Sequence, residues 1–178
     1  MAVLLFGANP GLTLFAGDDR RPVAFASVWR VDWSVRGAGR ALVLWHEGRP
    51  RVLTEAPELG HWVAEAFVRH FPEVDGLPWP EPEVLEAPVR LELDHATGVR
   101  AEAADVRLDI SGPLDRRVIE VARFPGNGLR LRNVYVPCHA GTLHVAGVAV
   151  PGAPRVTAAP RPSSTAFLAD AEVWSDGP

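Results

Sequence analysis

The clearest pattern of apolar and polar positions runs from Pro22 to Val35 and has a period of two. Its odd positions are Val23, Phe25, Ser27, Trp29, Val31, Trp33 and Val35. This alternation predicts a β-strand with one buried face, because successive side chains of a strand point to opposite sides. We expect Trp29 and Trp33 on that buried face, about 13 Å apart. An aspartate at Trp33 should then unfold the chain, whereas Asp32→Asn should have little effect.

The predicted strand is also unusually long. Fully extended, it would measure roughly 43 Å, about twice the usual length of a strand. A strand of this length must coil or bend, and we expect the bend at Ser27, the one small polar residue on the apolar face. Long coiled strands are typical of barrels and strongly curved sheets. The pattern therefore favours a curved sheet over a flat one.

Most of the remaining chain has the pattern of short strands divided by turns that contain glycine or proline. These strands are expected at residues 3–6, 12–16, 41–45, 51–54, 89–93, 99–103, 106–110, 117–124, 129–136 and 143–150. A helix is predicted over residues 57–71, where apolar residues recur at helical spacing and Pro72 prevents continuation. The predicted fold is mainly β: an antiparallel β-barrel or a strongly curved two-sheet β-sandwich with one amphipathic α-helix.

The pattern also predicts the domain organisation. We expect residues 1–150 to form a single β-rich domain that includes the helix and a proline-rich crossover at 72–82. Residues 151–178 are predicted to be a proline-rich C-terminal extension that packs back on this domain. Within the extension, residues 165–174 fit a short helix by one spacing and a strand by the other, and we prefer the strand.

The composition excludes several classes of enzyme. All eighteen basic residues are arginine, so the sequence contains no lysine. This excludes Schiff-base catalysis by lysine, lysine-bound pyridoxal phosphate and a Walker A loop. The single cysteine, Cys138, excludes an intramolecular disulfide and a four-cysteine zinc site. No motif indicates a cofactor.

Charge and hydropathy bear on location and partners. The net charge is −4, and acidic and basic residues are interleaved without the basic stripe that nucleic-acid binding requires. No apolar run approaches the roughly 18 residues needed to span a bilayer. The apolar segment Met1–Phe6 lacks the basic residues of a signal peptide. We therefore expect a cytoplasmic protein with neither nucleic acid nor membrane as a partner.

Histidines are the candidates for catalytic chemistry. If Ala140-Gly141 forms a two-residue hairpin turn, His139 and His144 lie on the same face within ~7–8 Å of each other. Such a pair can titrate near neutral pH or, with a third ligand, hold a metal. Two surface histidines without a function are the favoured alternative, so no metal site is favoured. His46, at the end of a predicted strand, is a further candidate.

The leading hypothesis for function is the binding of a small apolar or aromatic molecule in a Trp-lined barrel cavity, for carriage or for conversion without a cofactor. The expected ligand-binding residues are Phe25, Trp29, Arg30, Trp33 and Trp45. For Trp29 and Trp33, simple packing in the core is the alternative. For Arg30, the alternative is an ordinary ion pair with Asp32 on a solvent face.

Two further hypotheses belong to other classes. The first is a non-catalytic module for protein interaction or self-assembly, with a homodimer as the expected form, because a strand-rich chain has sheet edges to cover. The second is a metal-dependent enzyme that uses His139 and His144. The sequence does not decide between an enzyme and a binding protein.

Overall fold

The structure is a computed structural model that describes residues 1–175. Strands make up 57% of it and helices 9%, which confirms the predicted mainly β class. Its elements in chain order are β1 (Ala2–Ala8), β2 (Gly11–Leu14), β3 (Ala24–Ser34), β4 (Gly39–His46), β5 (Arg49–Thr54), α1 (Pro57–Ala66), η1 (Val68–His70), η2 (Pro72–Val74), β6 (Glu83–Glu86), β7 (Val89–Asp94), β8 (Gly98–Ala103), β9 (Val106–Pro113), β10 (Arg117–Val121), β11 (Arg130–Val145), β12 (Val148–Ala149), β13 (Val156–Thr157), β14 (Ser163–Ser164) and β15 (Ala166–Ser175).

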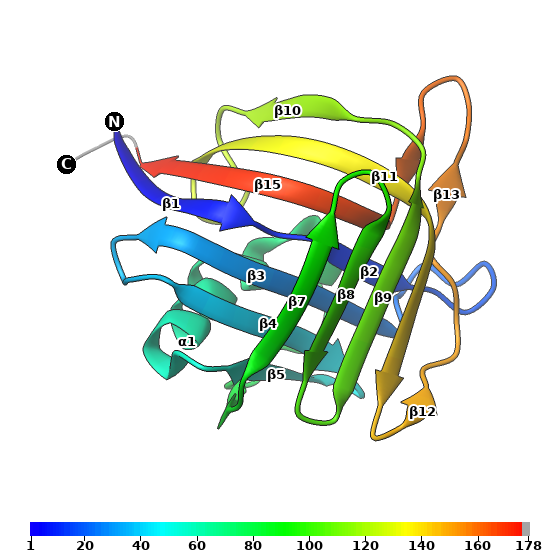
Figure 1. Cartoon of the computed structure of the whole chain (residues 1–178), viewed down its shortest axis with the longest axis horizontal. Helices are drawn as coiled ribbons and strands as arrows, with labels where there is room; N and C mark the ends of the chain where they lie inside the picture. The colour runs from blue at the N-terminus through cyan, green and yellow to red at the C-terminus, as the bar shows by residue number, and fades with distance from the viewer. Residues whose placement is uncertain (176–178) are drawn as a thin grey trace.

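Nearly all strands belong to one 13-stranded sheet. Its order is β6-β5-β4-β3-β1-β15-β11-β9-β8-β7, and β2, β10 and β12 attach to strands of this row. The sheet curls over itself, so that β7, β8 and β9 cross in front of β2, β3 and β4 (Figure 1). Arg40 on β4 donates a hydrogen bond to the Val89 carbonyl on β7 (3.2 Å), although β6 and β7 do not pair within residues 1–175. The sheet is thus an incompletely closed roll and not a closed barrel.

Both faces of the first half of β3 are buried, which corrects the one-faced strand predicted from the sequence. The side chains at odd positions, Phe25 and Trp29, pack between the sheet and α1. We call this hydrophobic cluster the outer core. The even side chains Ala26 and Val28 are fully buried in an inner core, inside the roll. Alanine is small and apolar, so it fits a tightly curled interior as readily as a surface.

The second half of β3 exposes Trp33, and the predicted burial of this side chain is wrong. Phe6 of β1 pairs with Trp33, whereas the next residue, Gly7, pairs with Val31. Asp32 is therefore an extra residue, and such a β-bulge re-aims the side chains that follow it. Trp33 is 44% exposed and stacks on Phe6, with ring centroids 6.1 Å apart.

β11 is a 16-residue strand that runs straight through Ala140 and Gly141, so the predicted hairpin turn is wrong. Gly141 pairs with Ile110 of β9, and a Cβ atom on it would lie 2.4 Å from a methyl carbon of Leu12. The glycine thus permits close packing inside the roll and does not reverse the chain. His139 and His144 lie five positions apart on this one strand, about 16 Å in extended chain.

α1 ends at Ala66, earlier than the predicted end at residue 71. Phe67 leaves the helical conformation at φ −124° and packs between Trp29 and Trp62, at ring-centroid distances of 5.7 and 5.0 Å. The chain then continues through the 3-10 turns η1 and η2. Among the described residues, no helix has the length and apolar character needed to cross a bilayer.

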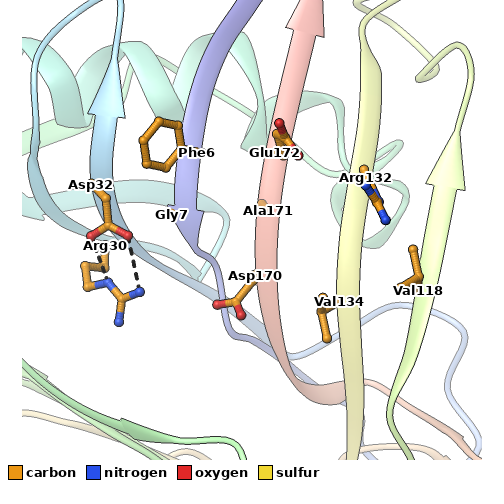
Figure 2. A pocket seen from close by; sticks show the side chains of 10 residues that line it. All are labelled: Phe6, Gly7, Arg30, Asp32, Val118, Arg132, Val134, Asp170, Ala171 and Glu172. Carbon is orange, nitrogen blue, oxygen red and sulfur yellow. Dashed lines mark hydrogen bonds and ion pairs between the residues drawn. The ribbon is translucent and has the colours of Figure 1, made fainter.

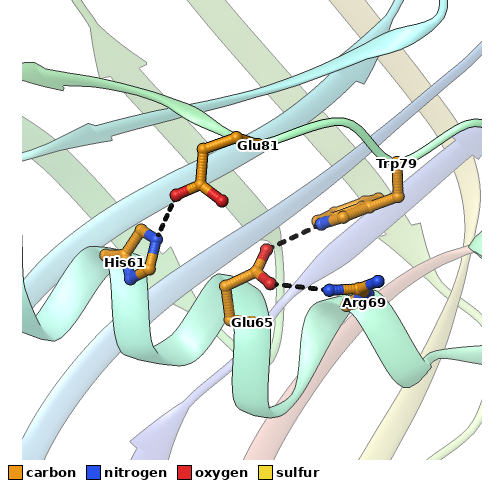
Figure 3. Close-up of polar contacts among 5 residues, drawn as sticks. All are labelled: His61, Glu65, Arg69, Trp79 and Glu81. Carbon is orange, nitrogen blue, oxygen red and sulfur yellow. Dashed lines mark hydrogen bonds and ion pairs between the residues drawn. The ribbon is translucent and has the colours of Figure 1, made fainter.

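The proline-rich segment after η2 lies along α1 and is held there by side-chain contacts (Figure 3). Trp79 donates a hydrogen bond from Nε1 to the Glu65 carboxylate (2.8 Å), which also accepts one from Arg69 (2.9 Å). Nearby, the His61 ring lies 2.9 Å from the Glu81 carboxylate. These contacts hold the helical segment in place over the outer core.

The C-terminal segment supplies β15, in agreement with the strand alternative for residues 165–174. β15 pairs with β1 along one side and with β11 along the other. It therefore lies in the middle of the sheet and joins the N-terminal strands to the later ones (Figure 1).

Candidate functional site

A cavity of about 340 Å³ lies in the outer core, between the sheet and the chain that follows α1. β3, β10, β11 and β15 contribute to it from the sheet, and residues 67–73 and 124–129 contribute from outside the sheet. The lining residues are Asn9, Trp29, Phe67, Phe71, Pro72, Glu73, Ile119, Val121, Phe124, Asn127, Leu129, Leu131, Asn133, Phe167, Ala169, Ala171 and Val173.

Alternation along β15 creates this space. Phe167, Ala169, Ala171 and Val173 share one face of the strand, because side chains two apart in a strand point the same way. The two alanines in the middle of this face leave room that a larger side chain would fill. Pairing of β15 with β11 places Asn133 directly beside Ala171. A polar amide therefore stands next to the emptiest part of the face.

Four aromatic side chains form a continuous wall of the cavity. The Trp29 ring lies 5.7 Å from Phe67 and 6.3 Å from Phe71, measured between centroids. Phe71 in turn meets Phe124 edge-to-face at 5.8 Å. These distances fall within the range over which aromatic rings attract one another. The wall is thus a packed, apolar surface in which Trp29 and Phe67 are almost fully buried.

Two polar atoms of the lining residues are buried without a hydrogen-bond partner in residues 1–175. They are Nε1 of Trp29, a donor, and Oδ1 of Asn133, an acceptor. Asn9, by contrast, donates hydrogen bonds to the Ser27 hydroxyl (2.9 Å) and the Val28 carbonyl (2.8 Å). An unpaired buried polar group costs about 1–3 kcal/mol, so folded proteins carry few of them. Both atoms belong to side chains that line the cavity.

Glu73 is the single ionisable side chain among the described residues that line the cavity. Burial raises the pKa of its carboxyl above the ordinary glutamate range, and a hydrogen bond from its own backbone N–H offsets part of this increase. Within residues 1–175, no arginine or histidine compensates the charge. Glu73 is therefore a carboxylate that the fold holds at a cost, which is typical of functional positions.

We predict that Glu73→Gln stabilises the protein at pH 7. The folded chain keeps the Glu73 proton to higher pH than the unfolded chain does, because its pKa is raised. Stability therefore falls as pH rises from the ordinary glutamate pKa, about 4.3, through the folded pKa, and stays lower above it. The amide removes this penalty. Thermal unfolding at pH 7 should show a gain on the order of 1 kcal/mol, a rise in Tm of roughly 2–4 °C.

The gain should disappear at pH values below the ordinary glutamate pKa, where the carboxyl is protonated in the folded and unfolded chain alike. Glu120→Gln provides the control, because Glu120 is an exposed carboxylate that faces Arg132 at 3.5 Å. It should change Tm little at either pH. A Glu73→Gln variant that is no more stable than the natural chain at pH 7 would show that the Glu73 carboxyl is well solvated.

Of the five predicted ligand-binding residues, Trp29 alone lines the cavity among the described residues. Phe25 is 1% exposed and packs edge-to-face behind the cavity wall, with its ring centroid 6.4 Å from that of Phe71. Trp45 is also buried in the outer core, where its Nε1 donates a hydrogen bond to the Pro78 carbonyl (2.8 Å). Phe25 thus supports the wall from behind, and Trp45 is its neighbour on β4.

Arg30 lies on the opposite side of the sheet, in an open hollow of about 510 Å³ (Figure 2). Its Nε is 3.0 Å from Asp32 Oδ1, and the two side chains are 38% and 44% exposed. This is the solvent-face ion pair foreseen as the alternative. Asp170 and Glu172 of β15 line the same hollow, so it presents charge of both signs. Trp33 lines neither this hollow nor the cavity in the described chain.

The predicted catalytic residues do not come together. His139 is exposed, His144 is partly buried farther along β11, and His46 ends β4. In the part of the chain that is described, no three His, Cys, Asp or Glu side chains lie close enough to hold a metal ion. Burial raises the pKa of the Cys138 thiol to about 11, so it is not a thiolate nucleophile at neutral pH.

Sequence reasoning missed Glu73, Asn133 and the two alanines of β15. Glu73 falls in the stretch assigned to a crossover, where a carboxylate is unremarkable. Asn133 carried a usable signal, because it is the one amide in β11 and follows the apolar Leu131 on the same strand face. Its meaning depends on the β15 register, which links residues far apart in the chain.

Searches among known proteins identify no relative, since no family model, curated protein or solved structure matches the chain.

Proposed function

We propose that this protein binds a small, largely apolar molecule in the outer-core cavity. The observation that carries the proposal is the pair of unpartnered polar atoms, Trp29 Nε1 and Asn133 Oδ1, on residues that line an otherwise apolar cavity. Ligand sites have this composition: mostly apolar walls with a few polar groups that fix orientation. The volume of about 340 Å³ lies at the lower end of the usual range for such sites.

Carriage is favoured over conversion of the bound molecule. Catalysis without a cofactor commonly uses a nucleophile beside a base, or an acid and a base with separated pKa values. Among the described lining residues, Glu73 is the single ionisable group, so a second acid or base is lacking there. The remaining polar lining groups are asparagine amides and the Trp29 indole N–H, which orient a ligand but do not transform it.

We predict that Ile119→Trp weakens the binding of N-phenylnaphthylamine, a neutral dye that fluoresces strongly in apolar sites. Ile119 lines the cavity from β10, and an indole there would occupy much of the available space. The natural chain should give a saturable rise in dye fluorescence with a micromolar Kd. The variant should lower the affinity by at least about tenfold, or 1.4 kcal/mol.

Val118→Trp is the matched control. Val118 is the neighbour of Ile119 on the same strand, is 51% exposed and lines the open hollow on the other side of the sheet. It should bind the dye as the natural chain does. Equal losses in both variants, or an unchanged affinity in Ile119→Trp, would place the dye elsewhere. An absence of saturable binding to the natural chain would contradict the proposed function.

A further inference from the structure

We infer that the ligand of this cavity is an organic cation: an amine or quaternary ammonium group attached to an apolar body. This inference rests on the proposed function and narrows it to one class of molecule. Three features of the cavity support it independently. They are the uncompensated Glu73 carboxylate, the aromatic wall, and the unpaired oxygen of Asn133.

The charge of the cavity favours a cationic ligand. Glu73 is the single ionisable group among the described lining residues, and arginine and histidine do not occur among them. An anionic ligand would place a second negative charge in the same poorly solvated space, where repulsion between like charges is strong. A neutral ligand would displace water from Glu73 and leave its charge buried without a partner. A cation compensates the charge, so Glu73 selects it over both.

The aromatic wall also favours a cationic ligand. Ring faces carry the negative end of the aromatic quadrupole, and a cation within about 6 Å of a ring centroid is attracted to them, most strongly by tryptophan. Trp29, Phe67, Phe71 and Phe124 all line the cavity; Trp29 packs on Phe67 and Phe71, and Phe71 packs on Phe124. The attraction grows when the cation is desolvated. Aromatic rings around one carboxylate are a typical site for ammonium groups.

The unpaired hydrogen-bonding groups of the cavity favour the same class of ligand. Asn133 Oδ1 is an acceptor without a partner within residues 1–175, and an ammonium N–H is a donor that suits it. Trp29 Nε1 is a donor and calls for an oxygen or another acceptor on the ligand. An anion would satisfy Trp29, but it would leave Asn133 unpaired and would oppose Glu73. A cationic ligand that also carries a hydroxyl or ether oxygen satisfies all three residues.

Competition against N-phenylnaphthylamine tests the inference. Three competitors of similar size differ in charge: phenylbutylamine, phenylbutanol and phenylbutanoate. At about pH 8 an alkylamine remains protonated. We expect the amine to displace the dye at a concentration at least about tenfold lower than the alcohol, and the carboxylate to be the weakest of the three. The amine-to-alcohol ratio of inhibition constants is the readout, so each variant serves as its own reference.

In Glu73→Gln we expect this ratio to fall to about one. Glu120→Gln makes the same change of charge outside the cavity and should keep the ratio of the natural chain. Saturable dye binding with equal inhibition by amine and alcohol would overturn the inference and leave the proposed function standing. A preference for the amine that persists in Glu73→Gln would also overturn the assignment to this carboxylate. Failure of the dye itself to bind would contradict the proposed function.

Discussion

Ala26→Asp should leave no folded protein at 25 °C, whereas Trp33→Asp should remain folded with a loss of about 1–2 kcal/mol. Ala26 is fully buried in the inner core, where its strand neighbours are Leu12 and Leu44. An ionised carboxylate without a partner there costs several kcal/mol, against a total stability of about 5–15 kcal/mol. Trp33 is 44% exposed, and its replacement mainly removes the stacking on Phe6, worth about 0.5–1.5 kcal/mol.

Urea unfolding followed by circular dichroism measures both effects. Asp32→Asn is the control, because it alters an exposed ion pair worth at most about 1 kcal/mol. The result would reverse the expectation derived from the alternating sequence pattern, in which Trp33 is the buried position. Complete unfolding by Trp33→Asp, with Ala26→Asp still folded, would mean that the bulge at Asp32 does not form.

Gly7→Ala should destabilise the protein by about 3 kcal/mol or more. A Cβ atom on Gly7 would lie 1.9 Å from the carbonyl oxygen of Arg30, which is a backbone atom and cannot move alone. The close approach occurs where the β1–β3 register shifts. A methyl group would force the two strands apart and break the hydrogen bonds on either side. The midpoint of urea unfolding should fall while its slope is unchanged.

Gly17→Ala is the appropriate comparison for this substitution. Gly17 has φ +55° in an open turn, and nothing lies within 4 Å of a Cβ placed there. Its replacement costs the conformational preference alone, about 1–2 kcal/mol. If Gly7→Ala is no more destabilising than Gly17→Ala, β1 and β3 are farther apart at this point than the structure indicates.

The sequence predicted the class of the fold but not the arrangement of its layers. Alternation and turn residues identified the strands, and helical spacing identified α1, because these signals are local. The second buried face of β3 was not predicted, because Ala24 and Ala26 are compatible with a buried or an exposed position. The bulge at Asp32 depends on the partner strand β1, and the continuity of β11 through Gly141 depends on pairing with β9. Neither partner is near in sequence.

Of the candidate site, the sequence predicted the one feature with a local signal and not the cavity around it. Trp29 was identified because a large aromatic residue on an apolar strand face is a local signal. The cavity around it is assembled from β3, β10, β11, β15 and η2. Its polar character lies in Glu73 and Asn133. The register of β11 and β15 places Asn133, and the packing of the chain around Phe71 on Trp29 places Glu73. The hypothesis of self-assembly stays a prediction that light scattering can address.

The position of β15 has a consequence for the synthesis of the protein. The strand that joins the two parts of the sheet is formed by residues 166–175, whereas its partner β1 is formed by residues 2–8. At about 5–20 residues per second, the ribosome needs roughly 8–32 seconds to pass from one strand to the other. During that interval the edge of β1 lacks this partner and is open to other chains, and such edges promote aggregation. The sheet can therefore be completed only after residues 166–175 have been synthesised, and a nascent chain that stalls before β15 is a candidate for chaperone binding.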